Sequence, residues 1–284
     1  MRSARRPANL RTMPPVRLSI AIVTYRTTGA MLDRCIASLA RSVERAREAG
    51  LAAECDLFVI DNGAPAEPGP QVEPGTWRHG GLRVMHGHGN LGYGRANNLV
   101  LGELRSDVHV VMNPDVEVDP EAIGAAIAAL AAHPGIGLVA PAVYDARGER
   151  QYLCKRYPSV WVLFLRGFAP AFLRRRFQGA IDRYEMRDAI AERFVEDIPL
   201  ASGCFMAIRT PLFVRLAGFD AHYFMYFEDY DLSVRLARHA ALAYAPEARI
   251  VHHGGGAAGK GWRHVRWFVR SAWRFFSRHG WKIA

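Results

Sequence analysis

The amino-acid sequence predicts an α/β fold with a central, mostly parallel β-sheet flanked by helices. Residues 18–25 form a short apolar run rich in β-branched side chains, which is typical of a buried parallel strand. Apolar residues then recur at helical spacing between Met31 and Leu39, and a second apolar run occupies residues 56–60. Strand, helix and strand in this order predict a right-handed βαβ unit, whose ligands bind at the carboxyl ends of its strands.

The same alternation continues along the chain. Further strands are predicted at residues 82–85, 108–112, 137–140, 242–246 and 249–252, and an alanine-rich helix is predicted at 120–132.

The composition is that of a folded globular protein with an unusual charge. The 284 residues are 50% hydrophobic and 23% charged, which excludes wholesale disorder. A formal net charge of +10 indicates an anionic partner, such as nucleic acid, a phospholipid surface or a phosphorylated small molecule. The four cysteines form no C-x-x-C pair, which argues against a zinc ribbon or disulfide framework and fits a reducing cytosol. We expect neither a signal peptide nor a membrane span, because no uncharged apolar run approaches about 18 residues.

Polar side chains follow three of the predicted strands. Thr24 and Tyr25 end the first, Asp61 follows the second, and the strand at 108–112 gives way to Pro114-Asp115. Because proline cannot continue a central strand, we expect Asp115 to project from a strand end. A carboxylate there suits a hard divalent cation that bridges a diphosphate.

A glycine-rich segment occupies residues 87–98. Its four glycines let the backbone approach a ligand closely, and its asparagines add hydrogen-bonding groups at the start of a helix. The spacing matches neither G-x-G-x-x-G nor the P-loop, so this segment alone does not define a ligand.

An aromatic run at residues 223–227 leads directly into three carboxylates, Glu228, Asp229 and Asp231. Aromatic rings beside clustered acids raise the pKa of a carboxyl group and suit it to act as a general base. The apolar spacing that follows predicts a helix starting near Asp231, with the acids at its positive end. The alternative is an acidic first turn that only caps this helix.

Two basic, aromatic stretches depart from the α/β alternation. Residues 151–195 contain clustered arginines and aromatic side chains and predict an insertion or lid. Residues 261–284 predict an amphipathic helix, with arginines three and four residues apart on one face and aromatic residues mostly opposite. Such a helix either docks on an anionic membrane surface or packs its aromatic face on the domain, and both hold if it lies at the domain edge.

Seven segments together resemble the family 2 glycosyltransferases of the GT-A fold, in particular their bacterial rhamnosyltransferase-like branch. They are IVTY at 22–25, DN at 61–62, GNLGYGRANN at 89–98, MNPD at 112–115, SGCFM at 202–206, FEDYD at 227–231 and VHHGG at 251–255. With this resemblance we predict a Rossmann-like GT-A domain at residues 18–260 that includes the 151–195 insertion. A basic tail at 1–17 precedes it and the helical segment at 261–284 follows it.

The resemblance implies a role for individual residues in binding the donor and a metal ion. Asp61 would hold the donor base, and the donor site would further include Thr24, Tyr25, Asn90, Gly92, Arg95, Asn98, Asn113, Asp115, Ser202 and Gly203. Asp115 and His252 would hold one divalent cation, Mg²⁺ or Mn²⁺, and His253 stays open as the alternative ligand. Asn113 departs from the family pattern, because it stands where the first acid of a D-x-D motif is expected.

The resemblance also implies the reaction. Asp229 would be the catalytic base that deprotonates the acceptor hydroxyl, with Glu228 and Asp231 binding the acceptor. The implied activity is an inverting, metal-dependent transfer of L-rhamnose from dTDP-rhamnose. The acceptor would be a polyprenyl-diphosphate-linked sugar or another glycan of the cell surface, and the enzyme would lie on the cytosolic face of the inner membrane, bound to its anionic surface.

Two alternatives remain at this stage. The missing first acid is compatible with a catalytically impaired relative that acts as a scaffold. The arginine face of residues 263–278 is compatible with nucleic-acid binding, but the clustered acids would repel a phosphate backbone, so we expect no nucleic-acid partner.

Overall fold

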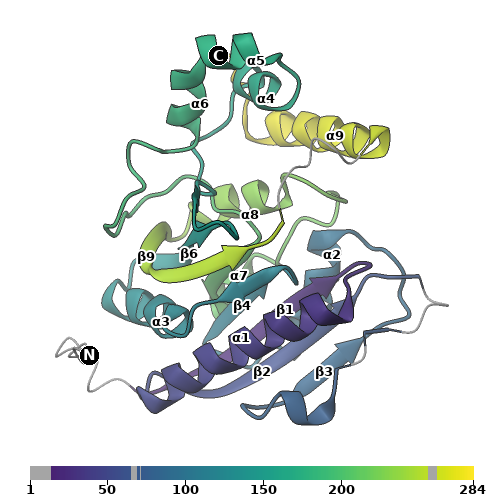
Figure 1. Cartoon of the computed structure of the whole chain (residues 1–284), viewed down its shortest axis with the longest axis vertical. Helices are drawn as coiled ribbons and strands as arrows, with labels where there is room; N and C mark the ends of the chain where they lie inside the picture. Colours follow the sequence, from purple (N-terminus) through teal and green to yellow (C-terminus); the bar gives the residue numbers. More distant parts are fainter. Residues whose placement is uncertain (1–13, 65–68, 71, 255–260) are drawn as a thin grey trace.

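The computed structural model describes residues 14–64, 69–70, 72–254 and 261–284, so most of the predicted basic tail lies outside the described residues (Figure 1). The strands are β1 (Val16–Thr24), β2 (Ala52–Asp61), β3 (Leu82–Met85), β4 (Val108–Met112), β5 (Val116–Val118), β6 (Ile136–Tyr144), β7 (Arg150–Gln151), β8 (Phe205–Arg209) and β9 (Ala241–His252). The α-helices are α1 (Gly29–Glu48), α2 (Tyr93–Asn97), α3 (Ala122–Ala132), α4 (Val160–Gly167), α5 (Ala171–Arg176), α6 (Gln178–Tyr184), α7 (Thr210–Arg215), α8 (Glu228–Leu236) and α9 (Trp262–His279). Two short 3₁₀ helices, η2 (Pro74–Thr76) and η3 (Asn98–Glu103), complete the described elements.

These strands form one sheet in the order β3-β2-β1-β4-β8-β6-β9-β5, with β7 paired to β6. The pairs β2–β3, β1–β2 and β1–β4 are parallel, as the βαβ pattern predicts. The second half is mixed, because β8 runs antiparallel to both β4 and β6. The insertion explains this direction: it leaves from the carboxyl edge after β6 and returns there, so β8 starts at that edge and runs back.

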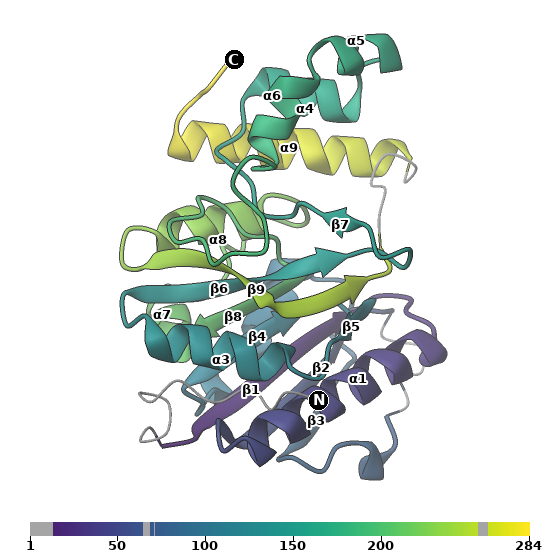
Figure 2. The ribbon, with the colours of Figure 1, turned by 60° about the vertical axis from the view of Figure 1, so that its left-hand side comes forward.

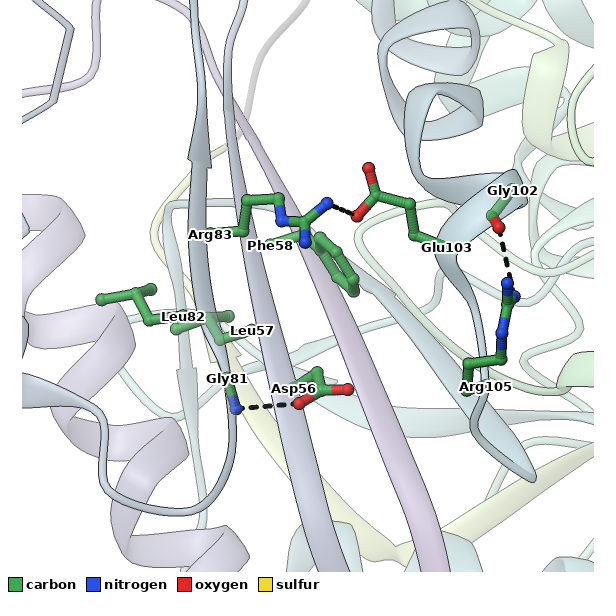
Figure 3. A pocket seen from close by; sticks show the side chains of 9 residues that line it. All are labelled: Asp56, Leu57, Phe58, Gly81, Leu82, Arg83, Gly102, Glu103 and Arg105. Atoms are coloured by element: carbon green, nitrogen blue, oxygen red, sulfur yellow. Dashed lines mark hydrogen bonds and ion pairs between the residues drawn. The ribbon is translucent and has the colours of Figure 1, made fainter.

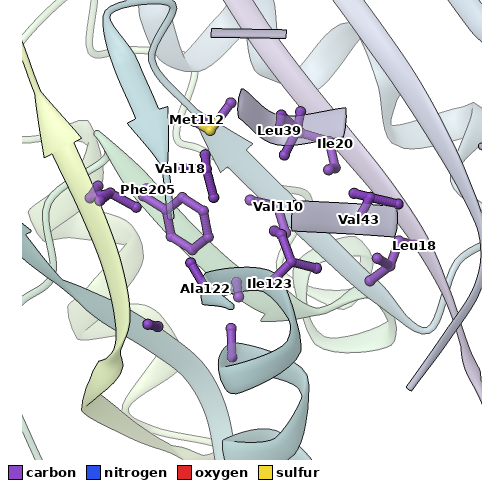
Figure 4. Close-up of a cluster of buried hydrophobic side chains, with 14 of the residues drawn as sticks. Leu18, Ile20, Leu39, Val43, Val110, Met112, Val118, Ala122, Ile123 and Phe205 are labelled. Atoms are coloured by element: carbon purple, nitrogen blue, oxygen red, sulfur yellow. The ribbon is translucent and has the colours of Figure 1, made fainter. Parts of the chain in front are cut away.

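The central strands are buried on both faces, and their side chains alternate between two hydrophobic clusters, one of which is drawn in Figure 4. In β1, Leu18, Ile20 and Ile22 pack with α1 and α3, whereas Ala21 and Val23 belong to the cluster on the opposite face. Burial on both sides is the reason that the sequence shows continuous apolar runs instead of a polar–apolar alternation.

Helix α9 lies beside the helices of the predicted insertion (Figure 2), and a third hydrophobic cluster joins them. Phe275 and Phe276 of α9 are buried there against side chains of α4, α6 and the residues that lead into α8. The aromatic face of α9 therefore packs on the domain. Trp262 and Trp273, however, remain 79% and 66% exposed on the other side of the helix. Packing of α9 on the domain therefore does not account for all its aromatic residues.

Two details differ from the sequence prediction. Residues 242–246 and 249–252 form one strand, β9, instead of two, because a register shift against β6 between Ala245 and Arg249 accommodates Pro246 outside the ladder. Helix α8 begins at Glu228 instead of near Asp231, which places the acids in its first turn. Within the described ranges, none of the helices combines the length and apolar character needed to cross a bilayer.

Candidate active site

The sheet topology brings the predicted site residues to one edge. Strands β1, β2 and β4 are parallel, so Thr24, Asp61 and Asp115 lie at or just beyond the same edge. Two antiparallel steps, β4 to β8 and β8 to β6, restore the original direction, and β9 runs parallel to β6. The start of β8, after Ser202-Gly203, and the end of β9, at His252, therefore share this edge.

Asp115 and His252 form a close pair at the end of β9. The register pairs Val116 with His252, and His252 Nε2 lies 3.5 Å from Asp115 Oδ1. Gly254 lies against them: a Cβ added there would stand 2.1 Å from Asp115 Oδ2 and 3.0 Å from His252 Nε2. Only glycine fits this position, because any side chain there would collide with Asp115 and crowd His252.

The neighbouring histidine points elsewhere. His253 Nε2 lies 3.0 Å from Glu117 Oε1 on the other side of the strand. The two adjacent histidines therefore have different partners, His252 with Asp115 and His253 with Glu117. The geometry selects His252, which the sequence could not distinguish from His253.

Asp115 and His252 fit a divalent cation, with one carboxylate and one imidazole as donors. In the described part of the chain, no group of three or more histidine, cysteine, aspartate or glutamate side chains could hold a metal ion. The protein thus offers two side-chain ligands at this edge, which leaves coordination positions for a diphosphate and water. Gln151 Oε1 lies 3.2 Å from His252 Nδ1 and orients the imidazole ring.

The ends of β1 and β2 and the glycine-rich loop are held together by side chains. Thr24 Oγ1 donates to Asp61 Oδ1 at 3.3 Å, and Tyr25 beside it is half exposed. Asn62 donates to Asn90 Oδ1 at 3.2 Å and accepts from the Leu91 amide at 2.9 Å. Asn62 therefore positions the loop; the sequence signal for this role was its place directly after a strand.

Gly92 connects the glycine-rich loop to the acidic helix. Its φ is +83°, and a Cβ there would meet the Phe224 carbonyl oxygen at 2.1 Å. The next amide, of Tyr93, donates to that same carbonyl at 3.2 Å. The loop thus packs directly against the segment that leads into Glu228, which requires glycine at this point.

Asp229 is held by backbone amides. Its Oδ2 accepts from Gly203 N at 3.0 Å, and its Oδ1 accepts from Tyr230 N at 2.9 Å. Tyr93 completes the contact by donating its hydroxyl to the Gly203 carbonyl at 2.6 Å. The small residue at 203, which we predicted to face the donor sugar, is therefore also the residue that fixes the predicted base.

Glu228 and Asp229 form a coupled pair of carboxyl groups with unequal environments. Burial, and next the charge of Asp229, raises the pKa of Glu228 to about 8. Burial also raises the pKa of Asp229, but the amides of Gly203 and Tyr230 oppose this effect. Among the described residues, Glu228 Oε2 has no hydrogen-bond partner. Asp229 is therefore the acid that ionises first, and Glu228 stays protonated beside it at neutral pH.

The two predicted centres lie close together around Cys204. Its thiol is buried, and burial together with the charges of Asp229 and Asp115 raises its pKa to about 12. The backbone supports the same conclusion, because Asn113 N donates to the Cys204 carbonyl at 3.0 Å while the adjacent Gly203 N binds Asp229. Asp115 and Asp229 thus flank one strand start.

Three predicted residues take other positions. The Asp231 side chain is fully buried and forms ion pairs with Arg235 at 2.6 Å and with His279 at 2.8 Å, so it anchors α9 to α8 instead of facing an acceptor. Asn98 uses both ends of its amide on the backbone of Phe219, so in this structure its polar atoms bind the protein itself. Arg95 lines a cavity of about 530 Å³ that it shares with α9, including Trp267 and Arg270.

Another cavity, of about 380 Å³, lies by the edge strand β3 (Figure 3). Its wall contains the Arg83–Glu103 ion pair and the carboxylate of Asp56, which accepts from Gly81 N at 2.8 Å. None of the residues that line it belongs to the predicted site. The carboxyl edge of the sheet therefore remains the candidate active site.

A pH-dependent change in stability follows from the buried Glu228. A carboxyl group whose pKa is raised on folding contributes stability that is present below its unfolded pKa and is lost as the pH rises through the folded value. For Glu228 this window runs from about pH 4.5 to about pH 8. We expect Glu228→Gln to unfold at a higher temperature than the unmodified protein at pH 8, by about 2–4 °C for each kcal/mol regained.

The control for this measurement is Glu54→Gln, which removes the same charge from an exposed side chain. The gain in the Glu228 variant should shrink toward pH 4.5 in thermal unfolding followed by circular dichroism. A gain that is equal at pH 4.5 and pH 8 would contradict a buried, protonated Glu228.

The residue types at this edge suit a divalent cation with a diphosphate, at Asp115 and His252, and a general base, at Asp229. This combination is the one expected of a nucleotide-sugar-dependent glycosyltransferase. The chain belongs to glycosyl transferase family 2, whose family profile matches residues 19–210.

Known proteins support this assignment. The chain is 30% identical over 255 residues to the N-acetylglucosaminyl-diphospho-decaprenol L-rhamnosyltransferase of Mycobacterium tuberculosis, covering 86% of this chain and 78% of that protein. It is 37% identical over 79 residues to the rhamnosyltransferase WbbL of Escherichia coli, covering 27% of this chain and 30% of that one. The prediction of a rhamnosyltransferase-like member of family 2 is confirmed, and the protein is an enzyme.

Solved structures confirm the GT-A fold. A mannosyltransferase from Pyrobaculum calidifontis, in complex with GDP-Man and Mn²⁺, superposes with a TM-score of 0.59 at 16% identity, over 94% of this chain and 65% of that one. GalNAc-T7, crystallised with UDP, GalNAc and Mn²⁺, superposes with a TM-score of 0.56 at 14% identity, over 86% of this chain and 44% of that one.

Proposed function

We propose that the protein transfers L-rhamnose, with inversion, from dTDP-L-rhamnose to a polyprenyl-diphosphate-linked N-acetylglucosamine at the cytosolic face of the membrane. The observation that carries the reaction is the placement of Asp229, held by the Gly203 and Tyr230 amides, at the same edge as Asp115 and His252. The choice of sugar and acceptor rests on the mycobacterial relative, whose name specifies an L-rhamnosyl group and an N-acetylglucosaminyl-diphospho-decaprenol. The dTDP carrier is the one that the family resemblance of the sequence implies.

In this proposal the acceptor hydroxyl attacks the anomeric carbon of the donor sugar. Asp229 accepts the hydroxyl proton, the new glycosidic bond forms, and the bond from the anomeric carbon to the diphosphate oxygen breaks. The nucleoside diphosphate leaves with the bonding electron pair, so the configuration at the anomeric carbon inverts. The backbone amides that bind Asp229 orient its carboxylate, and the protonated Glu228 beside it can donate a hydrogen bond but not compete for the proton.

Asp115 and His252 would hold a divalent cation, for which the two solved structures with Mn²⁺ give a precedent within the fold. When bound, this ion neutralises charge on the diphosphate. The protein's own part is to fix both side chains: glycine at 254 avoids a clash with them, and Gln151 holds the imidazole ring.

Contact with an anionic membrane surface is supported by the exposed face of α9. Trp262, Val269 and Trp273 are 79%, 55% and 66% exposed, and Arg266 and Arg270 lie between them at helical spacing. Indole rings and guanidinium groups together favour the headgroup region of a bilayer. The opposite face of α9 belongs to the third hydrophobic cluster, so packing on the domain and the proposed membrane contact use different faces of the helix.

We expect the double variant Trp262→Ser/Trp273→Ser to bind phosphatidylglycerol-containing vesicles more weakly by about tenfold or more, because burying one large apolar side chain contributes about 1.5 kcal/mol at least. Vesicle sedimentation measures the effect. The control is Val214→Ser, which removes an exposed apolar side chain from α7. Undiminished sedimentation of the double variant would show that this face of α9 does not dock on the membrane.

The proposed function is tested by measuring binding and slow hydrolysis of a panel of nucleotide sugars, with and without Mn²⁺. We expect dTDP-L-rhamnose to bind most tightly and its binding to require the metal. Transfer to a short isoprenyl-diphosphate-linked N-acetylglucosamine then tests the acceptor. Preference for a UDP- or GDP-linked sugar would refute the donor assignment, and turnover with the free sugar alone would refute the lipid-linked acceptor.

A further inference from the structure

The insertion contains a basic cavity that the reaction described above does not use. It has a volume of about 410 Å³ and lies between α4, α5 and α6 and the turn after α6. We call it the arginine pocket; its polar lining consists of Arg166, Arg174, Arg175, Gln178, Glu185 and Arg187.

The carboxylate of Glu185 in the pocket wall is already occupied by three cations. Lys155 and Arg166 each lie 3.2 Å from its Oε1, and Arg187 lies 2.7 Å from its Oε2. Asp182 adds a second acid, but it too is bound by Arg187, at 3.2 Å. Together with Arg174 and Arg175, these side chains make five cations beside two carboxylates, so the arginine pocket keeps an excess of positive charge.

Arg174 and Arg175 carry the excess. Over the described residues, neither side chain makes an ion pair or a hydrogen bond, although both line the same cavity as Arg166 and Arg187. Arg174 and Arg175 are both exposed, so their guanidinium groups are accessible to an anion in the pocket. Guanidinium groups bind phosphate through paired hydrogen bonds, so a phosphate-bearing ligand matches this lining best.

Two tyrosines connect the wall of the pocket to the segment that holds Asp229. Arg166 lies over the ring of Tyr184 at 5.4 Å, and the Tyr184 hydroxyl is 2.8 Å from the hydroxyl of Tyr230. Tyr230 directly follows Asp229 and donates its amide to it. A continuous set of contacts therefore links Arg166 in the pocket wall, through Tyr184 and Tyr230, to Asp229.

Exposed aromatic side chains surround the same part of the insertion. Phe168 and Phe172 are 51% and 72% exposed, and Phe172 follows Ala171, which lines the pocket. Charge within the pocket and apolar rings beside it match a ligand with a phosphate head and a hydrocarbon tail.

We propose that the arginine pocket binds the diphosphate of the lipid-linked acceptor, with the acceptor sugar toward Asp229 and the isoprenyl chain along Phe168 and Phe172. This inference rests on the proposed function and specifies how the acceptor is held. It assigns Arg174 and Arg175 to recognition of the diphosphate, apart from the donor residues at the carboxyl edge.

The test uses the full chain and farnesyl diphosphate as a short isoprenyl diphosphate probe, with calorimetry as the measurement. We expect Arg174→Gln/Arg175→Gln to bind the probe at least about tenfold more weakly, because each charge-assisted hydrogen bond contributes about 1.5 kcal/mol or more. The matched control, Arg176→Gln/Arg183→Gln, removes the same charge from neighbouring helix positions that do not line the pocket, and should stay within about twofold of the unmodified protein. Unchanged thermal unfolding confirms that both variants are folded.

Three outcomes decide the inference. Equal affinity of the pocket variant and the unmodified protein for farnesyl diphosphate would overturn it. Weaker binding to phosphatidylglycerol vesicles without any change for farnesyl diphosphate would identify a phospholipid-headgroup site and would also overturn it. Loss of farnesyl diphosphate binding with unchanged affinity for dTDP-L-rhamnose supports it.

The donor measurement separates this inference from the proposed function. If the unmodified protein bound farnesyl diphosphate through Arg174 and Arg175 but bound no nucleotide sugar, the transferase proposal would fail and the diphosphate specificity of the pocket would stand.

Discussion

Replacing Asp229 with asparagine should lower kcat by about 10³-fold, because a general base contributes roughly 10²–10⁴-fold to a proton-transfer step. Asparagine has nearly the same size as aspartate and can still accept one of the two hydrogen bonds from Gly203 and Tyr230, but it cannot take the acceptor proton. Donor affinity should remain within a few-fold, since the base acts on the acceptor. Transfer kinetics and donor binding by calorimetry measure the two effects separately.

The matched control for this variant is Asp231→Asn, on the same helix. The Asp231 carboxylate is buried against Arg235 and His279, so its replacement should lower the unfolding temperature and leave kcat nearly unchanged in the folded protein. Wild-type turnover of Asp229→Asn would remove Asp229 as the base. A large loss of turnover in a fully folded Asp231→Asn variant would instead return Asp231 to the acceptor site.

Much of the first half of the fold was predictable, since strands buried on both faces leave continuous apolar runs. This holds for β1, β2 and β4, whose side chains alternate between two clusters. Strands β5 and β7 span three and two residues, which is too short for a recognisable period. Helices α4 to α6 are six to eight residues long and depend on tertiary packing for their stability, so the sequence indicates only an interruption.

The site was predictable at the level of motifs but not of individual contacts. The sequence places Asp115 and Asp229 in recognisable segments, and the topology brings them to one edge. The sequence cannot show that the Asn98 amide forms a hydrogen bond with the backbone of Phe219, 121 positions away. Nor can it show that Asp231 binds His279, 48 positions away. Residues whose polar groups are satisfied by such distant partners are indistinguishable, within a motif, from residues that bind a ligand.

The second prediction with a large expected effect concerns Mn²⁺ binding by the two proposed metal ligands. We expect Asp115→Ala and His252→Ala each to weaken the binding of Mn²⁺ in the presence of dTDP by at least about tenfold, since even loss of an outer-shell partner costs roughly 10–100-fold in metal affinity. His253→Ala should leave this affinity unchanged, because His253 binds Glu117 on the opposite side of the strand. The two histidines are adjacent, so they form a matched pair in which only the direction of the side chain differs.

Titration of Mn²⁺ by calorimetry, with and without dTDP, measures these affinities without any turnover. The difference should be largest when dTDP is present, because two protein side chains alone leave most of the coordination to the diphosphate and water. Equal losses of Mn²⁺ affinity in the two histidine variants would contradict the assignment of His252, and not His253, as the ligand beside Asp115. Metal affinity independent of Asp115 would place the ion elsewhere and would separate the diphosphate from the edge where Asp229 lies.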